Sequence, residues 1–239
     1  MKRLAQWVFN RGKKEEVPTG PFRPRILLFD FDGTVGDTFI AGVEILNKLA
    51  DEFKFRRLKP EEVEGARDMT TMEFIRFLGV PTTKIVKVSK RGVKEFRSRI
   101  DGVNPFPHII PVLKELHKQG YLLGIVTSNA EENVARFLKR HHIECFDFIR
   151  CSSRLMGKAR VIKSLMKEKK MKPEEVLFVG DETRDIEATK KAGIQIAAVT
   201  WGYNSRRALE GQNPEYILDH PDELIPLLAE LTKNADEAA

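Results

Sequence analysis

The amino-acid sequence predicts an α/β protein with a doubly wound, mostly parallel sheet and an inserted helical module. Apolar, strand-like runs alternate with helix-like patterns from residue 104 to residue 231. Such alternation is typical of parallel sheets that carry helices on both faces. Residues 38–103 differ, because their apolar residues recur at helical spacing with little β-type alternation. We therefore expect a Rossmann-like core whose first strand is followed by a helical insertion.

The first strand is predicted within residues 25–32, where the apolar run is continuous, as in strands buried on both faces. Gly120 and Gly193 are expected to end two helices, since glycine accepts the left-handed conformation found there. Further strands are predicted over 121–127, 146–151, 176–180 and 194–200, with an edge strand over 216–218. Helices are predicted over 109–119, 131–141, 158–170, 185–192 and 221–231.

These patterns divide the chain into four regions. The α/β core comprises residues 25–37 and 104–232, and the helical module spans 38–103. Residues 1–24 are expected to form a basic arm, because they lack the long apolar run of a signal peptide. Residues 233–239 are expected to be a frayed tail. The sequence has no stretch of about 18 apolar residues, so neither a membrane-spanning helix nor a membrane partner is predicted.

Composition and charge favour a globular protein with a small anionic partner. Of the 239 residues, 41% are hydrophobic and 32% are charged, which is typical of a chain with a substantial core. The net charge of +6 suits an anionic ligand, but acidic and basic residues are interleaved, so no nucleic-acid partner is predicted. Cys145 and Cys151 are too few for a disulfide framework. We expect them to be small, buried apolar side chains, reduced in a cytoplasmic protein.

Polar residues are concentrated where the predicted strands end, and parallel sheets bind ligands at that edge. Asp30 and Asp32 lean toward the same side of the first strand, where their charges repel unless a cation or a shared proton intervenes. Mg²⁺ is the cation that such a pair of carboxylates favours. Asp181 and Asp185 repeat this pattern after the fourth strand. The alternative is that these aspartates cap turns and helices, as single aspartates often do.

A second set of residues offers groups that bind phosphate. Thr127, Ser128 and Asn129 supply hydroxyl, amide and backbone donors before a predicted helix, whose N-terminus favours anions. Lys158 lies at the start of another helix. Taken singly, these residues are typical of an ordinary helix cap and of a solvated surface lysine. Combined with the aspartates, they predict phosphoryl transfer, in which a carboxylate attacks phosphorus and cations neutralise its oxygens.

The chain resembles the phosphatases of the haloacid dehalogenase superfamily over about residues 25–231. Val35 stands where that family often has leucine, which is a conservative difference. Four segments resemble the family's motifs in the same order: Asp30–Val35, Thr127–Asn129, Lys158 and Gly180–Asp185.

The resemblance implies a role for each matching residue. Asp30 is implied as the nucleophile and a metal ligand, and Asp32 as a general acid and base whose backbone carbonyl also binds Mg²⁺. Asp181 and Asp185 are implied as further ligands of the metal. The residues implied to contact the phosphoryl group are Thr127, Ser128, Asn129, Lys158 and Gly33.

The helical module over 38–103 resembles the small α-helical cap of this family, which closes over the site and selects the leaving group. Its site-facing loop is expected at Gly65–Thr70, where Arg67 is a candidate for binding an anionic substrate tail. The alternative is a solvated arginine at a helix end. Segments Val179–Ile194 and Thr200–Ser205 resemble the phosphoglycolate-phosphatase-like branch, which implies a small phosphorylated metabolite as substrate.

These motifs leave other functions open. A dehalogenase fits poorly, because such members are expected to lack the second carboxylate, which here is Asp32. A phosphomutase or phosphotransferase uses the same aspartyl-phosphate chemistry as a phosphatase. A non-catalytic metabolite-binding module is a further alternative, against which the intact set of acidic residues argues. The oligomeric state is not predicted by any of these patterns.

Overall fold

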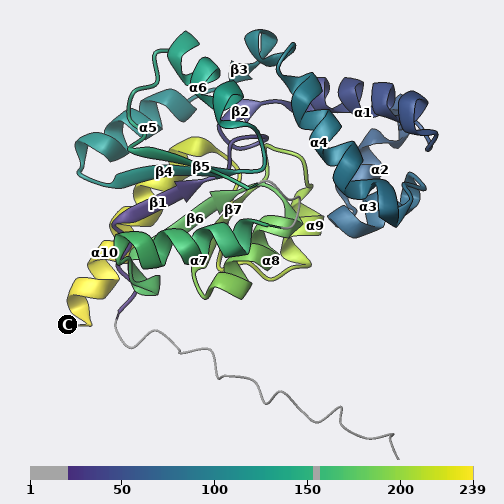
Figure 1. Cartoon of the computed structure of the whole chain (residues 1–239). Coiled ribbons are helices and arrows are strands. Elements are labelled where there is room, and N and C mark those ends of the chain that lie inside the picture. Colours follow the sequence, from purple (N-terminus) through teal and green to yellow (C-terminus); the bar gives the residue numbers. More distant parts are fainter. Residues whose placement is uncertain (1–20, 153–156, 239) are drawn as a thin grey trace, which may run out of the picture.

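The computed structural model describes residues 21–152 and 157–238, so the predicted basic arm over 1–24 lies outside the described residues except for 21–24. Six parallel strands form one sheet in the order β5-β4-β1-β6-β7-β8 (Figure 1). The predicted parallel α/β core is therefore confirmed. The strands are β1 (Ile26–Phe29), β4 (Leu122–Thr127), β5 (Phe148–Cys151), β6 (Val176–Gly180), β7 (Gln195–Val199) and β8 (Tyr216–Leu218).

Helices cover both faces of this sheet because its strands are apolar on both sides. In β1, Leu27 and Phe29 pack in one hydrophobic cluster, whereas Leu28 packs in a second cluster on the opposite face. The first cluster includes α5 (Ile109–Lys118), α6 (Glu131–Arg140) and α10 (Leu224–Glu237). The second includes α7 (Lys158–Lys169), α8 (Thr183–Ala192) and α9 (Arg206–Glu210). With both faces covered by apolar contacts, polar side chains gather at the ends of the strands.

The ends of several helices follow from local residues. Gly193, with φ 76°, ends α8, and Gly120, with φ 89°, follows α5, as predicted. The C-terminus differs from the prediction of a frayed tail over 233–239, because α10 continues to Glu237. Leu231 and Ala235 lie four residues apart on the buried face of α10, with 9% and 4% of their surface exposed. This packing extends the helix beyond the expected boundary.

The inserted residues 38–103, named the helical segment below, lie at one end of the α/β core (Figure 1). The start of its third helix is set by a capping box. The backbone N–H of Glu73 donates to Thr70 Oγ1 at 3.3 Å, and the backbone N–H of Thr70 donates to Glu73 Oε2 at 2.9 Å. The helices are α1 (Phe39–Phe53), α2 (Val63–Arg67), α3 (Thr71–Phe77) and α4 (Ile85–Phe96).

A two-stranded ribbon joins the helical segment to the core. In this ribbon β2 (Gly36–Asp37) pairs antiparallel with β3 (Asn104–Pro105). The sequence analysis did not predict the ribbon, because strands of two residues carry no periodic pattern. Short 3₁₀ turns lie at Pro60–Glu62, Thr82–Lys84, Ile100–Gly102, Pro173–Glu175 and Pro221–Glu223.

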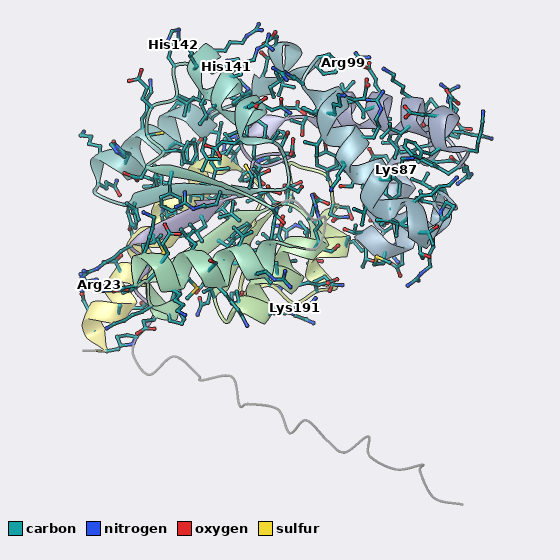
Figure 2. The ribbon with its side chains drawn as sticks, viewed as in Figure 1. Arg23, Lys87, Arg99, His141, His142 and Lys191 are labelled. Atoms are coloured by element: carbon teal, nitrogen blue, oxygen red, sulfur yellow. The ribbon has the colours of Figure 1, made fainter. Side chains whose placement is uncertain are left out.

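Charged side chains project from the outer surface of the described residues. Lys87 and Arg99 are exposed on the helical segment, and Lys191 is exposed on α8 (Figure 2). Within 21–152 and 157–238, no helix is long and apolar enough to cross a membrane. Both cysteines are reduced, and Cys145 is buried as predicted, whereas Cys151 is half-buried. Burial raises the pKa of Cys151 to about 11, so it stays a protonated thiol.

Candidate active site

Three neighbouring strands bring distant segments together at one edge of the sheet. β1 lies between β4 and β6, and Phe29 is in register with residues of both neighbours. Asp30 directly follows β1, Thr127 ends β4, and Asp181 directly follows β6. Because the three strands are parallel, these polar residues meet at the carboxyl-terminal edge although they are far apart in the sequence.

Asp30 is almost completely buried, with 1% of its surface exposed. Its Oδ1 accepts a hydrogen bond from the backbone N–H of Phe31 at 2.7 Å, and its Oδ2 forms an ion pair with the Lys158 ammonium. Burial raises the pKa of Asp30 to about 7, although the positive charge of Lys158 acts in the opposite direction. A second buried carboxylate holds this lysine, because Asp185 Oδ1 lies 2.5 Å from Lys158 Nζ.

Asp181 and Asp185 are buried beside Asp30, each with 0% of its surface exposed. Asp181 is held from two sides. Thr34 Oγ1 donates to its Oδ1 at 2.6 Å, and the backbone N–H of Tyr203 donates to its Oδ2 at 2.7 Å. Burial, followed by repulsion from neighbouring carboxylates, raises the pKa of Asp181 well above its ordinary value.

The side chains of Asp30, Asp181 and Asp185 form a set of hard oxygen ligands. One carboxylate oxygen of each lies within 4.8 Å of those of the other two. Asp30 Oδ2 receives no hydrogen bond from the described residues, and its one ion-pair partner there is Lys158. A single lysine between three buried carboxylates leaves an excess of negative charge, which is unfavourable in a buried site. The arrangement therefore fits a divalent cation that prefers oxygen ligands, such as Mg²⁺.

Asp32 lies at the same edge but is held differently. Asn129 Nδ2 donates to both of its carboxylate oxygens, at 3.1 and 3.2 Å, and Asn129 is itself fixed by Asn133 Nδ2, which donates to Asn129 Oδ1 at 2.8 Å. Burial raises the pKa of Asp32 to about 6, while the hydrogen bonds from Asn129 act in the opposite direction. A carboxyl group with this pKa is available in both protonation states near neutral pH, which suits proton transfer.

The loop after β4 is fixed by its own hydrogen bonds and by α8. Thr127 Oγ1 accepts from the backbone N–H of Asn129 at 2.9 Å, and Ser128 Oγ accepts from Arg184 Nη1 at 3.3 Å. Arg184 also forms an ion pair with Glu182 and has 8% of its surface exposed. The sequence analysis assigned no role to Arg184, although it lies within the segment resembling the fourth motif.

Two glycines make room for the Asp181 carboxylate. Gly33 has φ 77°, and a Cβ there would overlap both that carboxylate and the ring of Tyr203. A Cβ at Gly202 would overlap the same carboxylate and the carbonyl oxygen of Gly33. Close approach of the two loops to Asp181 therefore requires residues without a side chain.

The loop after β7 is part of the site, although the sequence analysis assigned its residues no role. The backbone N–H of Tyr203 holds Asp181, and its hydroxyl donates to the carbonyl oxygen of Thr38 at 3.0 Å. The loop therefore connects a metal-ligand candidate with the start of the helical segment. The sequence signal that could have indicated this role is a glycine between two aromatic residues, Trp201–Tyr203, directly after a predicted strand.

Arg67 contacts the same loop from the helical segment. Its Nε donates to the carbonyl oxygen of Tyr203 at 3.3 Å, and its Nη2 donates to that of Gly202 at 3.1 Å. Glu64 Oε2 lies 3.4 Å from Arg67 Nη1. These contacts attach the end of α2 to the core, and the binding of an anionic substrate tail by Arg67 stays a prediction.

The doubly wound core and its acidic strand-end site define the class of protein. The family model described as Haloacid dehalogenase-like hydrolase matches residues 27–199. This match covers more than half of the chain, so the protein belongs to the haloacid dehalogenase-like hydrolase family. The resemblance found in the motifs is confirmed.

Curated proteins similar to this chain include a phosphatase and a pyrophosphatase. A phosphoglycolate phosphatase of Synechococcus elongatus is 28% identical over 208 residues, which cover 87% of this chain and 98% of the relative. The pyrophosphatase PpaX of Bacillus thuringiensis is 33% identical over 136 residues, which cover 55% of this chain and 63% of that relative. Family and relatives together identify this protein as an enzyme of the phosphatase type, as the sequence predicted.

Solved structures support the fold. A predicted phosphatase from Clostridium acetobutylicum superposes with a TM-score of 0.74 at 20% identity and covers 87% of this chain and 99% of its own. A haloacid dehalogenase-like hydrolase from Streptococcus pneumoniae superposes with a TM-score of 0.70 at 24% identity and covers 85% of this chain and 98% of its own.

Proposed function

We propose that the protein is a Mg²⁺-dependent phosphatase that hydrolyses a small phosphate monoester through an aspartyl-phosphate on Asp30. The observation that carries this proposal is the environment of Asp30. Its buried carboxylate lies beside Lys158 and within 4.8 Å of carboxylate oxygens of Asp181 and Asp185. Such a site holds a nucleophile in place and offers positive charge to an incoming phosphate.

In the first step an Asp30 oxygen attacks phosphorus, and the bond between phosphorus and the leaving-group oxygen breaks. Asp32, with its pKa raised to about 6 by burial, gives its proton to that oxygen, so an alcohol departs. The hydrogen bonds from Asn129 keep the Asp32 carboxyl in position for this transfer. The products of this step are the alcohol, a phosphorylated Asp30 and an ionised Asp32.

In the second step water attacks the phosphorus of the aspartyl-phosphate. Asp32 takes a proton from the water, and the bond between phosphorus and the Asp30 oxygen breaks. Inorganic phosphate leaves, and both aspartates return to their starting protonation states. Covalent capture on Asp30 thus replaces one difficult displacement by two steps with lower barriers, and Asp32 serves in both.

The remaining site residues bind the phosphoryl group and the cation. Bound Mg²⁺ would neutralise charge on the phosphoryl oxygens and on the carboxylates of Asp30, Asp181 and Asp185. We propose the backbone carbonyl of Asp32 as a further ligand. Lys158 orients Asp30 and binds a phosphoryl oxygen. The proposed donors to the other oxygens are Thr127, Ser128, Asn129 and the backbone at Gly33.

The domain arrangement and the cellular location are part of the same proposal. Residues 38–103 act as a cap over a core formed by 25–37 and 104–232. Their position at one end of the core, beside the strand-end site, supports this role (Figure 1). The two reduced cysteines agree with a cytoplasmic protein. Phosphoglycolate, the substrate named for the Synechococcus elongatus relative, is a first candidate to test.

The test is release of inorganic phosphate from p-nitrophenyl phosphate by the full-length protein, with Mg²⁺ and with excess EDTA. We expect multiple turnovers with Mg²⁺ and none with EDTA. Asp30→Asn should lower kcat at least about 10⁴-fold, because its amide is a poor nucleophile. Asp37→Asn, an exposed aspartate in β2, is the matched control and should keep normal activity.

Equal activity of Asp30→Asn and the unmodified protein would exclude Asp30 as the nucleophile. Transfer of phosphate between hydroxyl groups that requires a bisphosphate activator and releases no inorganic phosphate would favour the phosphomutase alternative. Binding of phosphate esters without any turnover would favour the non-catalytic module.

A further inference from the structure

A cavity of about 350 Å³ lies between the helical segment and the strand-end site. On the core side its wall includes Asp32, Ser128 and Asn129. The cavity therefore begins at the proposed general acid, which is the residue that must face the leaving-group oxygen. A space of this size is within the range of small-molecule sites in proteins. Whatever occupies it lies on the leaving-group side of the phosphorus.

On the side of the helical segment, most of the cavity wall is apolar. Val43 and Leu46 contribute from α1, Phe74 and Ile75 from α3, and Val88 from α4. All five side chains are half-buried, so neighbouring residues leave part of the surface of each uncovered. A leaving group that fills this space would remove their remaining surface from water, which is favourable for an apolar group.

Three further apolar residues of the wall are buried. Leu49, Leu78 and Phe96 line the cavity with only 3%, 1% and 8% of their surface exposed. A charged group placed against them would lose part of its hydration without gaining a partner, which is unfavourable.

The arginines of the cavity wall already have partners. Within the described residues that line the cavity, the cationic side chains are Arg67 and Arg184. Arg67 donates to two backbone carbonyls of the loop after β7, and Arg184 is paired with Glu182, which lines the cavity as well. An anionic tail would therefore have to compete with Glu182 for Arg184, and with two backbone carbonyls and Glu64 for Arg67.

Other cations of the helical segment lie outside the cavity. Lys48 pairs with Glu95, and Arg99 pairs with Glu44, with 57% and 51% of the lysine and arginine side chains exposed. Figure 2 shows Arg99 and Lys87 on the outer surface of the segment. Their charges are screened by solvent and do not balance an anion inside.

We propose that this cavity binds the leaving group of the substrate and that this group is an uncharged alkyl or aryl chain. The substrate class is then a phosphate monoester of an apolar alcohol, rather than a phosphate with a second anionic group such as phosphoglycolate or pyrophosphate. This inference rests on the proposed function. The bond between phosphorus and the alcohol oxygen breaks, and the alcohol leaves into the apolar space with a proton from Asp32.

The first test is kcat/KM for n-alkyl phosphates from methyl to hexyl, beside phosphoglycolate and pyrophosphate. The acidity of these alcohols changes little along the series, so differences report binding of the chain. We expect kcat/KM to rise by up to about fourfold per methylene, the rate equivalent of moving one methylene out of water. A flat series with faster turnover of phosphoglycolate would overturn the inference and leave the proposed function intact.

Binding measurements separate the inference from the proposed function. Asp30→Asn should bind the same alkyl phosphates without turnover, so calorimetry can follow Kd along the series. Affinity that increases with chain length would support binding of the alkyl chain in the cavity, even if the unmodified protein releases no phosphate. Equal affinity for methyl and hexyl phosphate would overturn the inference, whatever the activity.

Two valines of α4 give a matched pair of variants. Val88 lines the cavity, whereas Val86, two residues earlier, is 59% exposed and faces away from it. Val88→Phe should lower the ratio of hexyl to methyl phosphate kcat/KM by about tenfold, because the added ring fills the space. Val86→Phe should leave that ratio unchanged.

A smaller substitution guards against misfolding of Val88→Phe. Val88→Ala should extend the preferred chain by one or more carbons and keep the circular dichroism spectrum of the unmodified protein. An unchanged chain-length profile in Val88→Ala and Val88→Phe would show that chains do not enter this cavity and would overturn the inference.

Discussion

The strand-end edge of the core and the inner surface of the helical segment differ in where they place charge. At the edge, Asp30, Asp181 and Asp185 are buried with at most 1% of their surface exposed. In the helical segment, ion pairs such as Arg99–Glu44 lie outside, with side chains 51% and 50% exposed. Exposed pairs of this kind contribute little to stability, whereas buried charges are unfavourable unless an opposite charge or hydrogen bonds compensate them.

Under the proposed function, this difference gives the two regions separate tasks. The core would supply fixed charges and donors around one phosphorus atom, in a geometry held by the parallel sheet. The helical segment would supply shape and apolar surface around the leaving group. Substitutions in the core edge should therefore change the rate of the chemistry, and substitutions in the segment should change which substrate is accepted.

After the loss expected for Asp30→Asn, the next largest effect comes from Asp32→Asn, which removes the proton donor without changing the shape of the side chain. We expect kcat to fall about 10³-fold with an alkyl phosphate, within the usual range for general acid catalysis. With p-nitrophenyl phosphate the loss in the first step should be much smaller, because nitrophenolate leaves without a proton. Burst-phase kinetics measure this step directly, and equal losses with both substrates would contradict the assignment of Asp32 as the acid.

A matched pair of leucines tests the packing of the two regions. Leu177 in β6 has 0% of its surface exposed, whereas Leu46 in α1 is half-buried against the cavity. Leu177→Ala should lower the free energy of unfolding by about 3 kcal/mol, because it creates a cavity in a close-packed core. Leu46→Ala should lower it by about 1 kcal/mol, since part of its surface already faces empty space.

Urea unfolding of both leucine variants, followed by circular dichroism, measures these changes. Equal destabilisation would mean that the wall of the cavity is packed as tightly as the core. That result would weaken the division of tasks between the two regions.

The smallest expected effect concerns Arg67, which attaches the helical segment to the loop after β7. Arg67→Gln should raise KM about threefold for every substrate and leave kcat nearly unchanged, because two hydrogen bonds to backbone carbonyls are weakened. Arg76→Gln, at an exposed position in α3, is the control. A loss confined to phosphoglycolate would instead support the predicted binding of an anionic tail by Arg67.

The sequence predicted the core well because its elements carry strong local patterns. The strand over 176–180 coincides with β6, and the continuous apolar run before Asp30 contains β1. Parallel strand order then places Asp30, Thr127 and Asp181 at one edge without further information. The roles of these three residues stay predictions. Their proximity follows from the apolar pattern of the strands and from the shared edge at which parallel strands end.

Other features depend on contacts that no local pattern encodes. The two-residue strands β2 and β3 exist because residues 36 and 105 come together across the whole helical segment. The support of Asp181 by the backbone of Tyr203 depends on a loop conformation, and backbone donors carry no residue signature. The extension of α10 to Glu237 accompanies burial of Ala235, and a single alanine does not show in the sequence whether it will be buried.

The central claim is that phosphate is transferred to Asp30. Its most direct test is to mix the protein with Mg²⁺ and substrate, quench during turnover, reduce acyl phosphates with borohydride, and sequence the peptides by mass spectrometry. Borohydride converts a phosphorylated aspartate to homoserine, so the account predicts homoserine at position 30, absent without substrate. Homoserine at another aspartate, or at none during measured turnover, would contradict it.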